Sequence, residues 1–180
     1  MLFRSAPVEL ELGAGDGSFL LQYSAAHPEV DFLGVERLFG RLRKIDRKGR
    51  RQGLKNLRGL RMEATYLMDW MIAPASLSAI HVYFPDPWPK ARHHRRRFVT
   101  QDHLEPLFGV MRSGGEFRVA TDIEDYVRQT LQEVPKAGFE WTAEGPSDWR
   151  EPWGDWHSTR YEQKALREGR TPHYLTFRKP

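Results

Sequence analysis

Three glycines alternate with other residues just after a short apolar run: Gly13, Gly15 and Gly17. Glycine lets a backbone turn sharply and lets a ligand approach it closely. Acids flank the turn at Glu11 and Asp16. These carboxylates would repel a pyrophosphate, and the glycine spacing differs from that of dinucleotide binders. Acids at this turn suit S-adenosylmethionine, which has no phosphate and carries a sulfonium and an ammonium. The alternative is a tight structural turn with solvated acids.

Two further acids stand where strands are expected to end. Glu36 lies about 20 residues beyond the glycines, where an acid can accept hydrogen bonds from ribose hydroxyls. Because NAD enzymes use the same device, Glu36 indicates a nucleoside without saying which one. Glu63 could accept a hydrogen bond from an adenine amino group. Alone it is more often a surface acid, so this assignment depends on its neighbours.

The most informative stretch covers residues 83–97. Pro85 and Pro87 frame Asp86, and prolines restrict their own φ and the neighbouring residue, so this acid is expected on a stiff backbone. An acid beside an aromatic ring such as Trp88 can recognise a nucleobase. Cationic side chains follow that could neutralise phosphates: Lys90, Arg92, Arg95, Arg96 and Arg97. The alternative is a proline-rich loop beside an unrelated charged face.

Later residues admit simpler interpretations. Asp122 could cap the helix that follows it. Thr159 with Glu162, three residues on, is typical of a helix-capping pair. The four tryptophans at positions 141–156 are expected to line or cover the core rather than to stack on bases.

These residues fall where strands and helices alternate. Strands are expected at 8–12, 31–36, 57–62, 77–84, 116–120, within the stretch after 139, and at 174–178. Helices are expected at 19–28, 39–53, 67–72, 101–111, 123–133 and 162–168, with Ser18 as the first N-cap. The alternation predicts an α/β, Rossmann-like domain over residues 1–180, with a mostly parallel seven-stranded sheet, helices on both faces, and a C-terminal elaboration from about residue 140. Ligands of such sheets bind at the carboxyl ends of the strands.

Composition restricts the function further. The 180 residues carry a net charge of only +4, but basic residues gather in 37–61 and 90–97. This clustering suggests a polyanion partner, and a plain solvated charged face is an equally weighted alternative. The absence of cysteine excludes disulfides and cysteine-based metal sites. The adjacent His93 and His94 lack a suitably spaced third ligand, so no metal site is predicted. No apolar run approaches the roughly 20 residues of a membrane span. Residues 1–7 are too short and polar for a secretory signal, so we expect a soluble cytoplasmic protein.

With these residues assembled, the chain resembles the bacterial tRNA (guanine-N7)-methyltransferase family over nearly its whole length. The most specific part of the likeness is residues 83–90. The other matching residues occur in the family's order: Glu11, Gly13, Gly15, Gly17, Gly34, Glu36, Arg92, His93, Arg96, Arg97, Thr121, Asp122, Thr159, Arg160, Tyr161 and Glu162.

The resemblance implies a class I methyltransferase that uses S-adenosyl-L-methionine to methylate N7 of guanine 46 in the tRNA variable loop, as a monomer or homodimer. Glu11, Glu36, Glu63 and Asp86 would then line the cofactor site. Residues that would contact the guanosine are Lys90, Asp122, Thr159, Arg160, Tyr161 and Glu162. Asp86 is the expected catalytic residue, which either faces the charge growing on the purine or anchors the cofactor's ammonium. Asp122 or Glu162 could accept from the N1–H and N2–H₂ edge of guanine.

Three departures from the family pattern qualify this expectation. Glu63 replaces a common Asp, and Arg160 replaces a common Lys, which keeps the charge but not the geometry. Relatives usually carry an N-terminal extension, so any tRNA contact made by it is expected to be missing. Three alternatives stay open: an NAD-dependent oxidoreductase, a non-catalytic RNA-binding module, and a methyltransferase acting on rRNA or protein.

Overall fold

The computed structural model describes residues 6–180. Residues 1–5, most of the segment considered above as a signal, lie outside the described part. The strands are β1 (Val8–Leu12), β2 (Asp31–Val35), β3 (Leu57–Leu60), β4 (Leu77–Tyr83), β5 (Met111–Thr121), β6 (Glu140–Trp141) and β7 (His173–Arg178). The helices are α1 (Ser18–Ala26), α2 (Phe39–Arg51), α3 (Ala64–Trp70), the 3-10 helix η1 (Ala91–Arg96), α4 (Gln101–Val110), α5 (Glu124–Lys136), α6 (Ser147–Arg150) and α7 (Arg160–Arg167).

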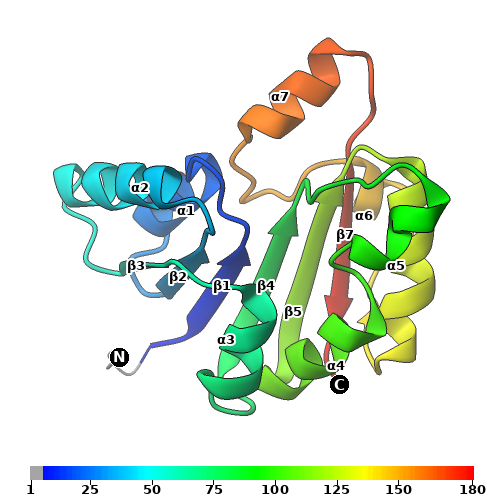
Figure 1. Ribbon diagram of the computed structural model, residues 1–180, viewed down its shortest axis with the longest axis horizontal. Helices are drawn as coiled ribbons and strands as arrows, with labels where there is room; N and C mark the ends of the chain where they lie inside the picture. The colour runs from blue at the N-terminus through cyan, green and yellow to red at the C-terminus, as the bar shows by residue number, and fades with distance from the viewer. Residues whose placement is uncertain (1–5) are drawn as a thin grey trace.

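The strands form one seven-stranded sheet in the order β3-β2-β1-β4-β5-β7-β6 (Figure 1). The pairs from β3 to β5 are parallel, whereas β7 runs antiparallel to both β5 and β6. The order reverses between β1 and β4, which is the position where α/β sheets of this kind bind their ligands. The predicted fold class, with its mostly parallel sheet, is confirmed.

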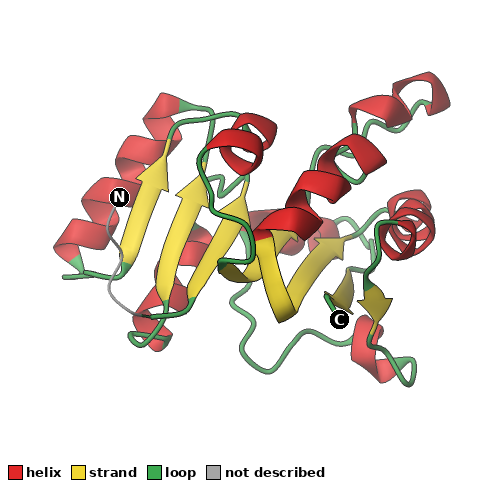
Figure 2. Ribbon diagram, turned by 90° about the horizontal axis from the view of Figure 1, so that it is seen from below, coloured by secondary structure: helices red, strands yellow, loops and turns green. Residues whose placement is uncertain are grey.

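Helices flank the sheet on both sides (Figure 2). On one face, Phe19 of α1 and Ile45 of α2 share a buried cluster with Tyr83 and Tyr174. The opposite face carries a larger cluster, in which the apolar residues of β1, β4 and β5 pack against α3, α4 and α5. Alternate residues of a strand point to opposite faces, and helices cover both faces, so even polar strand residues such as Glu11 and His81 are buried. This double burial fixes the strand ends at one edge of the sheet.

Two predicted caps are wrong. Gly17, with φ 74°, is the N-cap of α1, and the carboxylate of Asp16 accepts from the backbone N–H of Ser18. Asp122 does not cap α5. Thr121 Oγ1 accepts from the N–H of Ile123 instead, and Asp122 pairs with Arg170. In both places a side chain just before the helix accepts from a backbone N–H at its start, and the predicted cap residue makes no capping bond.

The tryptophans at 141–156 divide into two kinds. Trp153 and Trp156 pack edge to face, with ring centroids 5.6 Å apart, and both contact the ring of Tyr174. Trp141 is 41% exposed. The core-lining or covering role is confirmed for Trp149, Trp153 and Trp156, which all pack against buried clusters, and is wrong for Trp141. In the described part of the chain, no helix has the length and apolar character needed to cross a membrane, and no group of three or more acidic or histidine side chains could hold a metal ion.

Candidate active site

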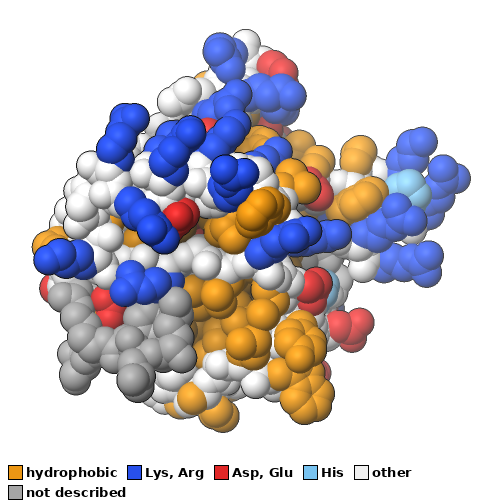
Figure 3. Space-filling view, turned by 60° about the vertical axis from the view of Figure 1, so that its left-hand side comes forward, with side chains coloured by type: hydrophobic (Ala, Val, Ile, Leu, Met, Phe, Trp, Pro, Cys, Tyr) orange, Lys and Arg blue, Asp and Glu red, His pale blue; other side chains and the backbone are white. Residues whose placement is uncertain are grey.

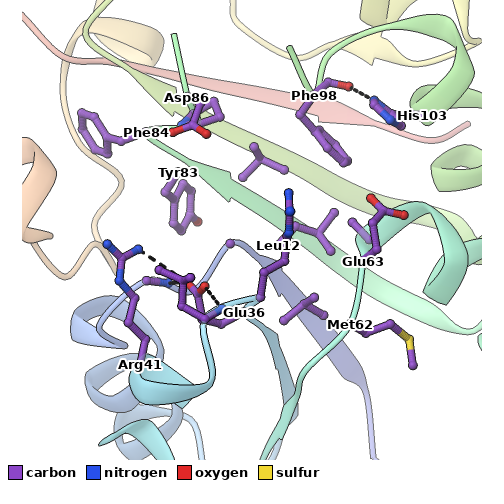
Figure 4. Close-up of a pocket in the computed structure, with 18 of the residues that line it drawn as sticks. Leu12, Glu36, Arg41, Met62, Glu63, Tyr83, Phe84, Asp86, Phe98 and His103 are labelled. Atoms are coloured by element: carbon purple, nitrogen blue, oxygen red, sulfur yellow. Dashed lines mark hydrogen bonds and ion pairs between the residues drawn. The ribbon is translucent and has the colours of Figure 1, made fainter. Parts of the chain in front are cut away.

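A cavity of about 670 Å³ opens at the carboxyl ends of the first four strands. Its lining includes Gly13 and Gly15 after β1, Glu36 after β2, Glu63 after β3 and Asp86 after β4. Figure 4 shows the three carboxylates coming from three different segments around this space. The structure thus places five of the predicted cofactor residues together, although they lie far apart in the sequence.

The glycine turn, residues 13–17, is held by hydrogen bonds from its backbone N–H groups. Gly13 and Gly15 have φ angles of 77° and 57°, which glycine adopts without strain. The N–H groups of Gly13 and Ala14 both donate to Val35 O at 2.9 Å, and Gly17 N–H donates to Ala14 O. Gly15 N–H donates to Glu36 Oε2 at 3.0 Å. A phosphate bound at such a turn needs free N–H donors, so this turn fits a ligand without phosphates.

Glu36 is buried and held from two directions. Besides the bond from Gly15, its Oε1 accepts from Leu38 N–H at 2.7 Å, and Arg41 Nη1 lies 3.8 Å from Oε2. A carboxylate offers about four lone-pair sites, so acceptor capacity remains for ribose hydroxyls. The side chain is therefore fixed in place before a nucleoside arrives.

Glu11 lies behind the turn rather than in the cavity wall. It is 4% exposed, and its Oε2 has no hydrogen-bond partner among the described residues. Burial, together with the nearby charges of Asp16 and Glu36, raises the pKa of Glu11 to about 8. A buried acid of this kind would be stabilised by a cation, so Glu11 fits the ammonium end of S-adenosylmethionine. Gly17 also lies outside the lining, because it packs against Ile45.

The segment after β4, residues 84–89, is called here the proline segment. Phe84 and Trp88, two residues to either side of Asp86, have φ angles of 48° and 40°. Bulky residues rarely adopt a positive φ, and such strain persists only where the surrounding structure enforces it. Arg96 lies over the Trp88 ring at 5.0 Å and both line the cavity, so part of the cationic run reaches the site.

The burial of Arg97 contradicts its predicted role as a phosphate contact. The residue is 1% exposed. Its Nε donates to Pro87 O at 2.9 Å, Nη1 donates to Gln129 Oε1, and Nη2 lies 2.9 Å from Asp125 Oδ2. The guanidinium therefore ties the proline segment to α5 and has no surface left for RNA. Exposed side chains that remain available to phosphates are Lys90, Arg92, Arg95 and Arg96.

The residues at 159–162 meet the cavity through Tyr161. Thr159 Oγ1 caps α7 by accepting from Glu162 N–H at 3.1 Å, as expected. Glu162 is buried and accepts from Trp156 Nε1 and from the hydroxyl of Tyr174, so the structure does not present it to a guanine edge. Tyr161 lines the cavity beside the glycine turn, and Arg160 lies 3.6 Å from Asp16 on the rim.

Several lining residues were not foreseen. Arg41, Arg61, Phe98 and His103 border the cavity, and the rings of Phe98 and His103 stack 5.1 Å apart. Arg61 directly follows β3, so the rule that ligands lie at strand ends could have found it. Phe98 and His103 reach the site through the fold of η1 and α4, and no spacing in the sequence signals that position.

Comparisons with known proteins agree with this geometry. A family model described as a putative methyltransferase matches residues 5–175. A protein of Ruegeria sp. (strain TM1040) named tRNA (guanine-N(7)-)-methyltransferase is 58% identical over 178 residues, which are 98% of this chain and 69% of that protein. The protein of the same name from Agrobacterium fabrum (strain C58 / ATCC 33970) is 43% identical, with 94% of this chain and 73% of that protein covered.

Solved structures resemble this chain in fold. The 16S rRNA methyltransferase KamB matches with a TM-score of 0.71 at 18% identity, covering 97% of this chain and 88% of that one. The [4+2]-cyclase SpnF matches with a TM-score of 0.67 at 14% identity, covering 97% and 76%. Because a cyclase and a methyltransferase share this architecture, the fold alone does not specify the reaction.

Proposed function

Because the chain belongs to the tRNA (guanine-N7)-methyltransferase family, we propose that it methylates N7 of guanine 46 in the variable loop of tRNA. The products are 7-methylguanosine and S-adenosylhomocysteine, and the proposed compartment is the cytoplasm. The observation that supports the proposal is one cavity lined both by the glycine turn, whose Gly13 and Gly15 N–H groups are already bonded within the protein, and by the strained segment that holds Asp86.

The cofactor is S-adenosyl-L-methionine. When bound, it supplies an electrophilic methyl group on a sulfonium. Gly13 and Gly15 would let the chain approach it closely, Glu36 would accept from the ribose hydroxyls, and Glu63 would accept from the adenine amino group. Glu11 would face the ammonium from behind the turn. Each role rests on the position of the residue in or beside the cavity.

Methyl transfer to guanine N7 requires no proton transfer by the protein before the methyl group moves. Guanine N7 has an in-plane lone pair and no proton at neutral pH, so no side chain has to act as a base before the methyl moves. The chain's contribution is then positioning and electrostatic stabilisation. Methylation leaves a cationic purine, and the carboxylate of Asp86 would stabilise that charge.

The guanosine and its phosphates are assigned to residues around the cavity mouth. Tyr161 would pack against the bound ligands, while the exposed Lys90 and Arg160 lie two residues after Trp88 and one residue before Tyr161, both of which line the cavity. Asp122 pairs with Arg170 and would need to exchange that partner to reach a guanine edge. Arg92, Arg95 and Arg96 are proposed to hold tRNA phosphates.

The test is to incubate the protein with S-adenosylmethionine and unmodified tRNA, digest the tRNA, and identify the methylated nucleoside. We expect 7-methylguanosine from tRNA with guanine 46 and none from a transcript with adenine there. Asp86→Ala should lower the rate by roughly 10²- to 10³-fold, the loss typical of a missing electrostatic partner. Asp86→Asn tests the charge at constant shape, and Arg112→Ala, at an exposed position near the start of β5, is the control. Near wild-type transfer by Asp86→Ala would refute its role, and methylation of another atom or of rRNA would refute the function.

A further inference from the structure

A second cationic region lies apart from the run at 90–97. The α2 surface comprises the exposed side chains of residues 37–61, which include α2, the loop after it and the edge strand β3. Its exposed cations are Arg37, Arg43, Lys44, Arg47, Lys48, Arg50, Arg51, Lys55, Arg58 and Arg61. Asp46 is the only acid in residues 37–61. Figure 3 shows the Lys and Arg side chains gathered on the face that includes α2, with a further cluster on the far side of an apolar area.

The charges on this surface are mostly uncompensated within the protein. Among the described residues, Arg50 is the exposed cation of this surface that forms an ion pair, with Asp46. The half-exposed Arg41 pairs with Glu36. Helix α2 is fixed by Ile45 and Gly49 on its buried side, so the cations are displayed from a rigid support. Like charges at this density repel one another, and a bound polyanion removes that repulsion.

An exposed aromatic ring stands within the surface. Phe39, the first residue of α2, is 54% exposed. The guanidinium carbons of Arg43 and Arg61 lie 5.8 Å and 5.6 Å from its ring centroid. Its neighbour Leu38 lines the cavity. Proteins that bind single-stranded nucleic acid stack bases on such rings and hold the backbone with nearby cations.

We propose that the α2 surface is a second RNA-binding site, in which Phe39 stacks on an unpaired base near the target guanine and the cations of α2 bind the adjoining phosphates. This inference rests on the proposed tRNA substrate. Arg37 and Arg61 border the cavity from the α2 side and Arg96 borders it from η1. The RNA backbone would therefore cross the cavity mouth with cations at both ends.

The first test removes charge without touching the cavity. Lys44, Arg47 and Arg51 share one side of α2 at helical spacing, and none lines the cavity. We expect a triple change to Ser to lower the slope of log affinity for tRNA against log salt by about 2, since each lost phosphate contact contributes roughly 0.7–0.9. The matched control changes the distant exposed cations Arg112, Arg128 and Arg150 to Ser. Equal slopes for the two triple variants would overturn the proposal.

The second test separates stacking from charge. Phe39→Ala should weaken tRNA binding by roughly 5- to 150-fold, the range of one lost base stack, while Phe39→Trp restores it. The KM for tRNA should rise with little change in kcat, and affinity for S-adenosylmethionine should not move. If Phe39→Ala binds tRNA as the wild type does, Phe39 is not a stacking platform. The α2 triple variant and Phe39→Ala are also tested for binding to heparin. If both weaken heparin binding as much as tRNA binding, the surface is a general polyanion patch and the proposal fails.

The two proposals fail separately. If the wild type makes no 7-methylguanosine yet its tRNA affinity depends on α2 and Phe39, the proposed reaction is wrong while the RNA surface stands. If 7-methylguanosine forms at normal KM in all the α2 variants, the reaction stands and the RNA surface is wrong.

Discussion

The glycine turn and the proline segment border the same cavity and use the same unusual backbone region in opposite ways. The turn places positive φ angles at Gly13, Gly15 and Gly17, where they require no strain. The proline segment places them at Phe84 and Trp88, where each costs about 1–3 kcal/mol. The glycine turn therefore adopts its shape without backbone strain, whereas the strained proline segment depends on contacts that hold it in place.

The contacts of the two loops match this difference. The turn is fixed by the neighbouring strand, through bonds to Val35 O and to Glu36. The proline segment is fixed to β5, because Phe84 N–H donates to Ala120 O at 2.7 Å. It is fixed to α5 through Arg97, which bonds Pro87 O and pairs with Asp125 of α5. The position of Asp86, the acid expected to face the reacting base, therefore depends on packing against residues much farther along the chain.

The strongest test of this dependence is Arg97→Lys. Lysine keeps the charge but cannot bond Pro87, Gln129 and Asp125 in the fixed fork of a guanidinium. We expect a loss of about 1–3 kcal/mol in the free energy of unfolding, and a roughly 10- to 100-fold lower kcat from a displaced Asp86. Denaturant unfolding and steady-state kinetics measure the two effects.

The exposed neighbour Arg95 provides the control. Arg95→Lys should change neither stability nor kcat. The salt dependence of tRNA binding should be the same for Arg97→Lys as for the wild type, since Arg97 is not at the surface. A flatter salt slope in Arg97→Ala than in Arg95→Ala would restore the phosphate role that the structure rejects.

The glycine turn can be broken with a single methyl group. A Cβ on Gly17 would lie 2.7 Å from Ile45 Cγ1 at a φ of 74°, so Gly17→Ala combines strain with a clash. We expect a stability loss of about 2–4 kcal/mol, from about 1 for the left-handed backbone and 1–3 for overpacking. Gly13→Ala, at a similar φ of 77° but with nothing within 4 Å of the added Cβ, should lose about 1 kcal/mol. Equal losses in thermal or urea unfolding would show that packing against α2 contributes nothing.

The raised pKa of Glu11, behind the glycine turn, predicts that the free energy of unfolding depends on pH. Its folded pKa of about 8 exceeds the unfolded value of 4.5. Its contribution to stability is therefore fully present below about pH 4.5 and is lost as pH rises through 8. Glu11→Gln should flatten this decline, as urea unfolding between pH 5 and 8 can measure.

The same residue links cofactor binding to protons. Pairing with the ammonium of S-adenosylmethionine favours the ionised carboxylate, so binding at pH 7 should release a proton from the wild type and none from Glu11→Gln. Titration calorimetry in buffers of different ionisation enthalpy measures that release. An identical proton release in both proteins would remove Glu11 from the cofactor site.

The smallest effect concerns strain outside the site. Ala75 is exposed in a turn with φ 53°, so Ala75→Gly should raise stability by about 0.5 kcal/mol, as strain relief slightly exceeds the added chain entropy. Phe84→Gly relieves the same strain but loosens the proline segment, so kcat should fall by several fold. A full kcat in Phe84→Gly would show that the strained backbone does not position Asp86.

Much of the fold followed from local patterns. Apolar runs that end in Gly13, Glu36, Glu63 and the proline segment predicted the strands, and parallel strands bring their carboxyl ends to one edge. The cofactor residues that directly follow strands were therefore placed together correctly in the cavity. The family resemblance, carried by residues 83–90, is confirmed by the matching family model and relatives.

Burial within the charged segments was not predictable in the same way. Arg95, Arg96 and Arg97 are identical in type, and only the packing of Arg97 under α5 separates an internal anchor from surface cations. Glu162 matched a capping pattern, yet its carboxylate bonds Trp156 and Tyr174. Local spacing describes the neighbours along the chain, whereas these outcomes depend on residues that arrive from elsewhere in the fold.

Because β7 lies between β5 and β6, the sheet cannot be completed until the last strand has been synthesised. Strand β6 is synthesised before β7 but joins the sheet only through it. Until β7 emerges, β5 presents an unpaired edge on which Phe117 and Val119 lack their partners Phe177 and Leu175. An apolar open edge pairs readily with other chains. A pause in translation before residue 173 would therefore leave the polypeptide most dependent on chaperones.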